Sequence, residues 1–229
     1  MMRSAMSMLE LVFAIVIMGI AVMSLPLILT QVQTNNAFAL QQEAILAAKT
    51  KIGDILTHEW DDNSYDAIAQ RSFVLDTANG DGTLSRVGTT NQRIGHINAD
   101  YRRKLYDATV VLNDRSASAI GADGGDLDDI DDFSGQATTI ARTLETAGTL
   151  DYVFTALTLT PTITYASDTA TYRNSTLTNF TFNPANAPAT PTNIKTIAVT
   201  VTGGNQNITL RAFSCNIGES SLLPSRPYL

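Results

Sequence analysis

The sequence predicts an α+β fold in which one long N-terminal α-helix packs on a C-terminal antiparallel β-sheet domain. The first observation is an uncharged, almost wholly apolar run over residues 11–29. The second is a continuation with apolar residues three and four positions apart, as far as His58. The third is strand-like alternation around a Gly-rich turn within 194–217. At 229 residues, the chain is long enough for one domain with a sizeable core, or for a small domain plus an extended element.

The first half of the helix, residues 6–30, has the length and composition of a transmembrane segment. At 1.5 Å per residue the uncharged run extends roughly 29 Å, close to the ~30 Å hydrocarbon core of a bilayer. It exceeds the apolar region of a cleaved secretory signal, which is usually about 7–15 residues long. Arg3 precedes the run, and the next basic residue is Lys49. By the positive-inside rule we expect a cytoplasmic N-terminus and a C-terminal domain in the periplasm or outside.

Glu10 is the acid inside this apolar segment. A carboxylate near the end of a spanning helix costs about 2–3 kcal/mol, and less if it reaches the interface. Glu10 either reaches the interface without a role or meets a positive charge inside the membrane. If the chain is cut before Met6, Glu10 becomes the fifth residue of the mature protein. The new α-amino group of a neighbouring copy would then neutralise it.

The stretch "AMSMLELVFAIVIMGIAVMSLPLIL" resembles the class III signal of type IV prepilins and type II secretion pseudopilins. That signal combines a short basic leader, a small residue at the cut, a hydrophobic helix and Glu at mature position five. The resemblance implies that residues 1–5 are the leader, that Ala5 precedes the cut and that Met6 becomes the methylated N-terminus. It also implies that Glu10 aligns each subunit with its neighbour. The family usually has Gly before the cut and Phe after it, whereas Ala5 and Met6 keep only the small size and the apolarity.

The resemblance implies a pilin-like fold and a function in filament assembly. Prepilin peptidase would cleave the chain, and the hydrophobic helix would assemble into a type IV pilus-like or type II secretion filament. The implied partners are other pilin or pseudopilin subunits, the peptidase, an inner-membrane assembly platform and membrane lipid. The protein would first be a single-pass inner-membrane protein and then part of the pilus or pseudopilus. The domain at 59–229 is larger and loopier than a compact major subunit needs, which favours a minor pilin.

The second half of the helix, residues 31–58, is predicted to be amphipathic and to bury one apolar stripe on the domain. Pro26 is expected to kink or loosen the helix because it has no amide donor. Asn35-Asn36 is a weak interruption, so two helices with a hinge near residue 35 are the alternative. The apolar positions of the predicted stripe are Val32, Phe38, Leu40, Ile45, Leu46, Ile52, Ile55 and Leu56.

Two acidic segments follow the helix. "DTANGDGTLSR" lacks acids at the first and twelfth places of an EF-type loop, so we expect a tight Gly-rich turn at 79–82. The segment 121–135 is a stronger candidate for a cation site, because six aspartates crowd into 123–132. Such crowding requires solvation, hydrogen bonds to backbone amides, or a cation.

The stretch "DLDDIDDFSG" within the acidic loop resembles a motif in minor prepilins of the mannose-sensitive haemagglutinin D type, as does the upstream "EAILAAKTKIGDILTHEWDDNS". The regular motif suggests a defined turn anchored by Ile130 and Phe133. A calcium ion is the one candidate cofactor. Its predicted ligands are Asp126, Asp128, Asp129, Asp131 and Asp132.

Strand signals occupy the rest of the domain. A short β-branched run at 107–114 comes first, and the alternating segment 152–166 breaks at Pro161, which suggests an edge position or a bulge. The clearest element is the hairpin at 194–217, with Gly203-Gly204-Asn205 as its turn. We expect Ile197, Val199 and Val201 on one face, answered by Ile208, Leu210 and Ala212 on the returning strand. The tail after the hairpin is expected to be extended.

Composition excludes several functional classes. The net charge of −7 argues against a nucleic-acid-binding surface. Cys215 is the only cysteine, so no intrachain disulfide forms, and we expect a small, half-buried strand residue. His58 and His96 have no neighbours at metal-ligand or catalytic spacing, and we expect no enzyme.

The alternative to a filament subunit is a membrane-tethered binding module or tip adhesin with a calcium-stabilised acidic loop.

Overall fold

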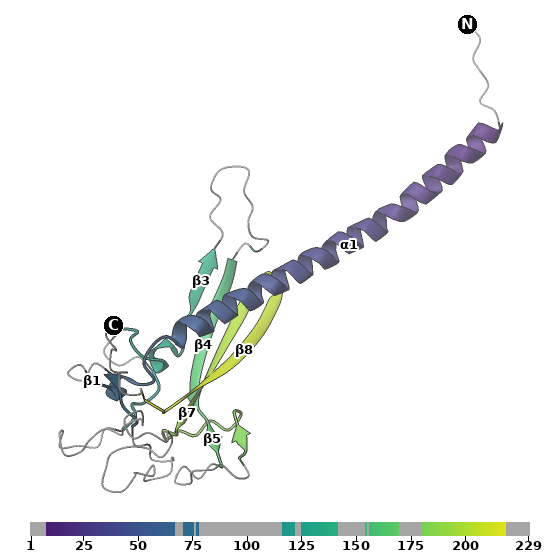
Figure 1. The fold of residues 1–229 in the computed structure, drawn as a ribbon. Coiled ribbons are helices and arrows are strands. Elements are labelled where there is room, and N and C mark those ends of the chain that lie inside the picture. The colour runs from purple at the N-terminus through teal and green to yellow at the C-terminus, as the bar shows by residue number, and fades with distance from the viewer. Residues whose placement is uncertain are drawn as a thin grey trace, which may run out of the picture.

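The computed structural model describes residues 8–66, 71–75, 77, 116–121, 125–141, 154, 156–169 and 180–218. In this part of the chain one long helix runs from the N-terminal side into an antiparallel sheet (Figure 1). The predicted α+β layout is therefore confirmed. The helices are α1 (Met8–Ile55) and the 3-10 turns η1 (Asp62–Ser64) and η3 (Asp131–Phe133). The strands are β1 (Tyr65–Asp66), β2 (Arg71–Ser72), β3 (Thr138–Ala141), β4 (Ala156–Tyr165), β5 (Ser167–Asp168), β6 (Phe182–Asn183), β7 (Ile194–Gly203) and β8 (Gln206–Cys215).

Helix α1 is continuous through both positions at which the sequence suggested an interruption. Figure 1 shows its ribbon curving gently without a break, so the alternative of two helices hinged near residue 35 is wrong. Pro26 lacks the amide that would bond one turn back. Next to it, Thr30 Oγ1 donates a 2.8 Å hydrogen bond to the carbonyl oxygen of Pro26. The helix ends at Ile55, slightly before the predicted His58.

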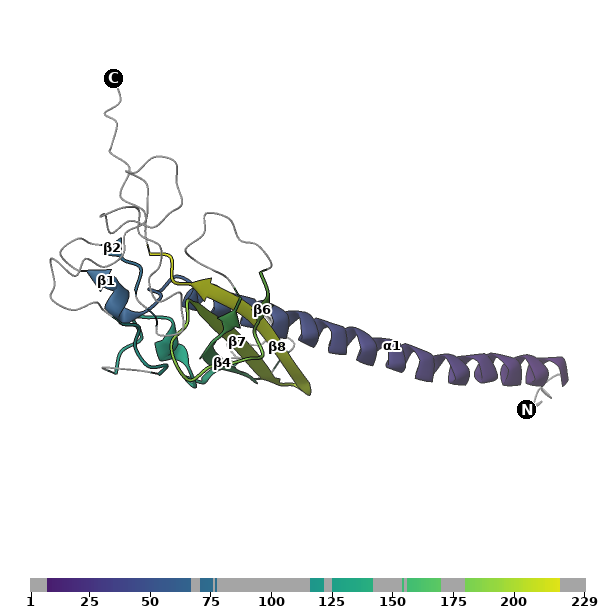
Figure 2. The same cartoon turned by 90° about the horizontal axis from the view of Figure 1, so that it is seen from below.

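The first half of α1 extends away from the sheet, as Figures 1 and 2 both show. Its large apolar side chains are exposed from Met8 to Leu29. The helix is long and apolar enough to cross a membrane, judged by length and composition alone.

The second half of α1 packs on β4, β7 and β8 through a stripe that matches the predicted one only at Leu40, Ile52 and Ile55. Ala44, Ala48 and Ile55 are buried, and Leu40, Ala47 and Ile52 are partly buried against the same core. The small alanines allow the backbones of helix and sheet to approach closely. The other predicted stripe residues are exposed, namely Val32, Phe38, Ile45, Leu46 and Leu56. That part of the prediction is wrong, because apolar residues are distributed around the helix and only one face meets the sheet.

The sheet has the order β3-β4-β7-β8, with every pair antiparallel. Ile197, Val199 and Val201 of β7 are fully buried on the face that meets α1. The neighbouring strand β4 contributes Leu157, Leu159 and Ile163 to the same core. The predicted alternation in β7 is confirmed, and the returning residues Ile208, Leu210 and Ala212 pack partly buried on this core.

The β7–β8 hairpin turns at the predicted glycines. Gly204 has φ 56° and Asn205 has φ 62°, and a type I′ turn requires positive values at both central residues. Gly203 has φ 140°, and a Cβ built there would lie 2.4 Å from the carbonyl oxygen of Ala156. Only glycine fits at position 203.

Pro161 lies in β4, which has neighbours on both sides, so the predicted edge strand is not found as such. The pairing with β7 is regular through Pro161↔Val199, without a bulge. However, β3 pairs only with 156–159 of β4. Beyond that point Gly135 N donates to the carbonyl oxygen of Pro161 at 2.9 Å, so no strand there needs the missing amide of Pro161. The predicted strand at 107–114, the turn at 79–82 and the tail lie outside the described residues.

Candidate functional site: a buried lysine and two groups of acids

The residues predicted for processing and assembly lie at the N-terminal end. Glu10 is exposed in the first turn of α1. Ala5 and Met6 lie outside the described residues. The predicted calcium ligands lie at the opposite end of the molecule, where the acidic loop meets the end of the helix.

The unexpected feature of that end is Lys195, a β7 residue whose side chain is 0% exposed. Its Nζ donates to the carbonyl oxygen of Trp60 at 2.6 Å and to Asp61 Oδ2 at 3.1 Å, and it also contacts Asp131 Oδ1. The ammonium lies 4.4 Å from the ring centroid of Trp60 and 5.7 Å from that of Tyr165. We call Lys195, Asp61, Asp129 and Asp131 the Lys195 cluster; the three acids are all buried, with carboxylate oxygens within 4.8 Å of one another.

Three elements bring this cluster together. Strand β7 places Lys195 two residues before Ile197, on the same buried face. The turn after α1 supplies Asp61, which caps η1 by accepting a hydrogen bond from Asn63 N. The acidic loop supplies Asp129 and Asp131. The alternation in β7 is therefore the sequence signal that could have found this buried lysine.

Backbone amides hold two of the three carboxylates of the cluster in place, those of Asp129 and Asp61. Asp129 Oδ1 accepts hydrogen bonds from the amides of Asp131 and Asp132 at 2.8 and 3.1 Å. Asp129 Oδ2 accepts one from Asp62 N at 2.8 Å. Asp61 Oδ2 accepts the Ser118 amide at 2.9 Å in addition to Lys195. Of the crowded acids, Asp129 is thus satisfied by backbone amides of the chain, which is one of the alternatives that the sequence left open.

Three buried carboxyls surround one ammonium, so negative charge is in excess. Burial and, to a smaller extent, the neighbouring Asp131 raise the pKa of Asp129 to about 7, against the opposing effect of Lys195. Burial also raises the pKa of Asp131, again opposed by Lys195. Burial and the nearby acids raise the pKa of the Tyr165 hydroxyl. The environment favours a proton on the Asp129–Asp131 pair over two buried charges there.

The remaining predicted calcium ligands form a second, outer group. Carboxylate oxygens of Asp126, Asp128 and Asp132 lie within 4.8 Å of one another. Asp126 and Asp128 are exposed, whereas Asp132 is buried and accepts from the Asp128 amide at 3.1 Å. The structure thus divides the five predicted ligands between an outer group and the Lys195 cluster. Only the outer group opens to solvent and offers oxygens to a hard cation.

The predicted anchors of the loop are confirmed, since Ile130 is 1% and Phe133 3% exposed. The ring of His58 packs edge-on against Phe133, with centroids 4.8 Å apart, and Lys51 Nζ lies 4.5 Å from the same ring centroid. His58 therefore has a packing role. Cys215 is half-buried at the end of β8, as predicted.

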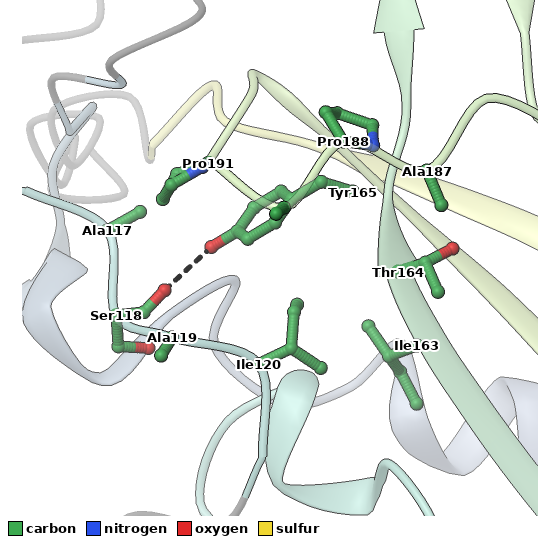
Figure 3. Close-up of a pocket in the computed structure, with 11 residues that line it drawn as sticks. Ala117, Ser118, Ala119, Ile120, Ile163, Thr164, Tyr165, Ala187, Pro188 and Pro191 are labelled. Carbon is green, nitrogen blue, oxygen red and sulfur yellow. Dashed lines mark hydrogen bonds between the residues drawn. The ribbon is translucent and has the colours of Figure 1, made fainter.

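A pocket of about 580 Å³ lies beside the Lys195 cluster, between 117–120, β4 and 187–191 (Figure 3). Figure 3 shows the Tyr165 hydroxyl directed at Ser118, whose carbonyl oxygen accepts its hydrogen bond at 2.9 Å. Tyr165 and Ser118 belong to both the pocket wall and the surroundings of the cluster. The rest of the labelled lining is mostly apolar, with alanines, isoleucines and prolines.

Comparison of the chain with protein-family models, curated proteins and solved structures finds no match. The exposed helix half and the two groups of acids are therefore the features of the described chain that bear on function. The first presents a large apolar surface with no cover from the described residues. The second is a concentration of charge at the opposite end.

Proposed function

We propose that this chain is a minor pilin or pseudopilin subunit that assembles through its N-terminal helix into a type IV pilus-like or type II secretion filament. The single observation that carries the proposal is the division of α1 into an exposed apolar half and a half packed on an antiparallel sheet. A helix with twenty or so uncovered apolar residues requires lipid or other helices around it. A subunit that leaves the membrane to join a filament meets both surroundings in turn.

The N-terminal motif supports the same proposal. Prepilin peptidase would cleave after Ala5 and methylate Met6, leaving Glu10 as the fifth residue. Glu10 would pair with the α-amino group of a neighbouring subunit, which neutralises an acid inside an apolar bundle. Before assembly the chain would lie in the inner membrane with its C-terminal domain in the periplasm.

The mass of the mature N-terminal peptide, taken from membranes and from sheared surface material, tests the proposal. The expected peptide begins at Met6 and carries one methyl group. Substituting Glu10→Ala should leave cleavage intact and remove the chain from sheared filaments, whereas Glu43→Ala, further along the same helix, should not remove it. A wild-type peptide that still begins at Met1 would overturn the proposal, because the chain would then be a plain membrane-anchored protein.

The second candidate is a membrane-tethered binding module or tip adhesin whose acidic loop holds calcium. The observation that favours it is the outer group of acids, with exposed Asp126 and Asp128 within 4.8 Å of Asp132 oxygens. Both candidate functions hold together if the chain is a subunit at the tip of a filament. Copy number in sheared material distinguishes them from a major subunit, because a tip or initiating subunit is scarce there.

A further inference from the structure

We propose that Lys195 and Asp131 become joined by an intramolecular amide bond between their side chains, which links β7 covalently to the acidic loop. The proposal goes beyond the filament function and is independent of it. It makes the Lys195 cluster a self-modification site, with the chain as its own substrate.

The two reacting side chains are already in contact. Lys195 Nζ touches Asp131 Oδ1, and the two side chains are 0% and 1% exposed. Lys195 is fixed on a strand paired on both sides, by β4 and by β8. Asp131 is fixed in η3, where its amide donates to Asp129 Oδ1 at 2.8 Å and its neighbours Ile130 and Phe133 are buried. Such positioning turns a slow bimolecular condensation into an effectively unimolecular step.

The surroundings keep water away from the reacting pair. The Trp60 and Tyr165 rings lie 4.4 and 5.7 Å from Nζ and occupy positions where water would otherwise lie. Removing water penalises both members of an ion pair, so joining them in a neutral amide removes the cost of keeping two charges buried. It also protects the amide, once formed, from hydrolysis.

The reaction balances within the chain. The Lys195 ammonium loses a proton to the surrounding carboxyls, and the neutral amine attacks Cγ of Asp131. A C–N bond forms, a C–O bond breaks, and the departing oxygen leaves as water with two hydrogens that began on the ammonium. The amide nitrogen keeps the third. One ammonium and one carboxylate are consumed, and one amide and one water are produced, with no oxidant or external reactant.

Asp129 is the group placed to carry the proton. Its carboxyl lies against that of Asp131, within 4.8 Å, and its own backbone hydrogen bonds hold it there. Asp61 Oδ2, which accepts from Lys195 Nζ at 3.1 Å, is the carrier if Asp129→Asn leaves the rate unchanged. The product leaves two acids in the cluster, each still bonded to backbone amides, and removes one buried carboxylate and one buried ammonium. It would also supply a covalent link in a chain whose one cysteine allows no intrachain disulfide.

A tryptic map of the full-length protein, extracted from membranes in detergent and denatured before digestion, tests the proposal. We expect no cleavage at Lys195 and a branched species in which peptide 116–142 is joined to peptide 174–211. Its mass should be lower than the sum of the two by one water. Recovery of separate peptides 116–142 and 174–195 as the main species would overturn the proposal. The map does not depend on N-terminal processing, so its failure and that of the filament proposal are distinguishable.

Two pairs of variants sharpen the test. Lys195→Arg keeps the positive charge but cannot form the amide, and should abolish the branched species. Its control, Lys51→Arg, alters a partly exposed lysine paired with Asp54 and should leave the species in place. Asp129→Asn should slow formation of the branched species at least tenfold in freshly synthesised protein, whereas Asp128→Asn in the outer group should not. An unchanged rate in Asp129→Asn would overturn its role as the proton carrier. If the Lys195 variant fails to fold, the wild-type map alone still decides the proposal.

Discussion

The two halves of α1 differ in what covers them. The first half carries large apolar side chains that are exposed from Met8 to Leu29, whereas the second half buries Ala44 and Ala48 completely against the sheet. The more apolar half is therefore the less covered one. Small residues let the helix backbone approach the strands on the face that packs within the chain, and Ile55 adds one large buried side chain there. Apolar content alone indicates that a partner exists, without indicating whether the chain supplies it.

The acidic region repeats this contrast in charged side chains. Asp61, Asp129 and Asp131 are buried around Lys195, and the first two accept hydrogen bonds from backbone amides, whereas Asp126 and Asp128 face solvent. The acids of the Lys195 cluster are part of the domain's own structure. The exposed acids of the outer group offer oxygens to a ligand outside the chain.

The largest effect on the Lys195 cluster is expected from Lys195→Met. Relative to protein in which the amide has not formed, removing the buried ammonium leaves the surrounding carboxylates uncompensated and should lower the free energy of unfolding by about 3–5 kcal/mol. The matched change Lys51→Met, at a partly exposed lysine in an i,i+3 pair, should cost less than about 1 kcal/mol. Urea denaturation of the full chain in detergent, followed by Trp60 fluorescence, measures both. Equal losses in the two variants would contradict the assigned importance of the cluster.

The exposed first half of α1 is tested by Val16→Arg. A charge at the centre of a spanning helix costs about 2.5–3.5 kcal/mol, so the variant should be depleted from the alkali-resistant membrane fraction and from filaments. Val32→Arg, at a similarly exposed valine beyond the apolar run, should stay in that fraction. Neither change should alter the unfolding of the domain. Similar membrane retention of both variants would indicate that the first half of α1 does not lie in lipid.

The two halves are compared most directly by the same substitution in each. Ala48→Leu adds volume where α1 meets the sheet and should lower the free energy of unfolding by about 1–3 kcal/mol. Ala21→Leu, on the exposed half, should leave it unchanged. Thermal unfolding monitored by circular dichroism distinguishes them. Destabilisation of the domain by Ala21→Leu would mean that the first half is also covered by the chain.

Protonation of Asp129 in the Lys195 cluster makes the free energy of unfolding depend on pH, with a sign that follows from its raised pKa. The pKa of Asp129 is raised to about 7 from 3.8, so between these values the folded state binds more protons than the unfolded state. The free energy of unfolding should therefore fall as pH rises, by up to about 1.4 kcal/mol per pH unit near pH 5–6. Asp129→Asn should flatten this slope, and Asp126→Asn should not. A wild-type stability that rises across this range would contradict the assignment.

Local patterns predicted the helix, the hairpin turn and the anchored acidic loop, because each depends on residues close in sequence. They did not predict the Lys195 cluster, since the partners of Lys195 lie 134 positions away at Asp61 and 64 positions away at Asp131. The alternation of β7 did place position 195 on the buried face, so the lysine itself was predictable from Ile197. The helix stripe was mispredicted for a related reason. Large apolar residues were counted as buried, and the alanines that meet the sheet were not counted.

The smallest expected effect is stabilisation of the domain by calcium bound at the outer group of acids. Calcium sites of extracellular modules bind with Kd on the order of 10⁻³ M, so calcium at a concentration near Kd should stabilise the domain by about 0.4 kcal/mol. Thermal unfolding of the full chain in calcium chloride and in chelator measures the difference. Asp126→Asn should remove it, whereas Asp168→Asn, in β5 and in neither group, should retain it. If calcium stabilises Asp126→Asn as much as the wild type, the ion binds elsewhere. If it stabilises neither, the outer acids are a solvated surface, and among the described residues only the exposed helix half then implies a partner outside the chain.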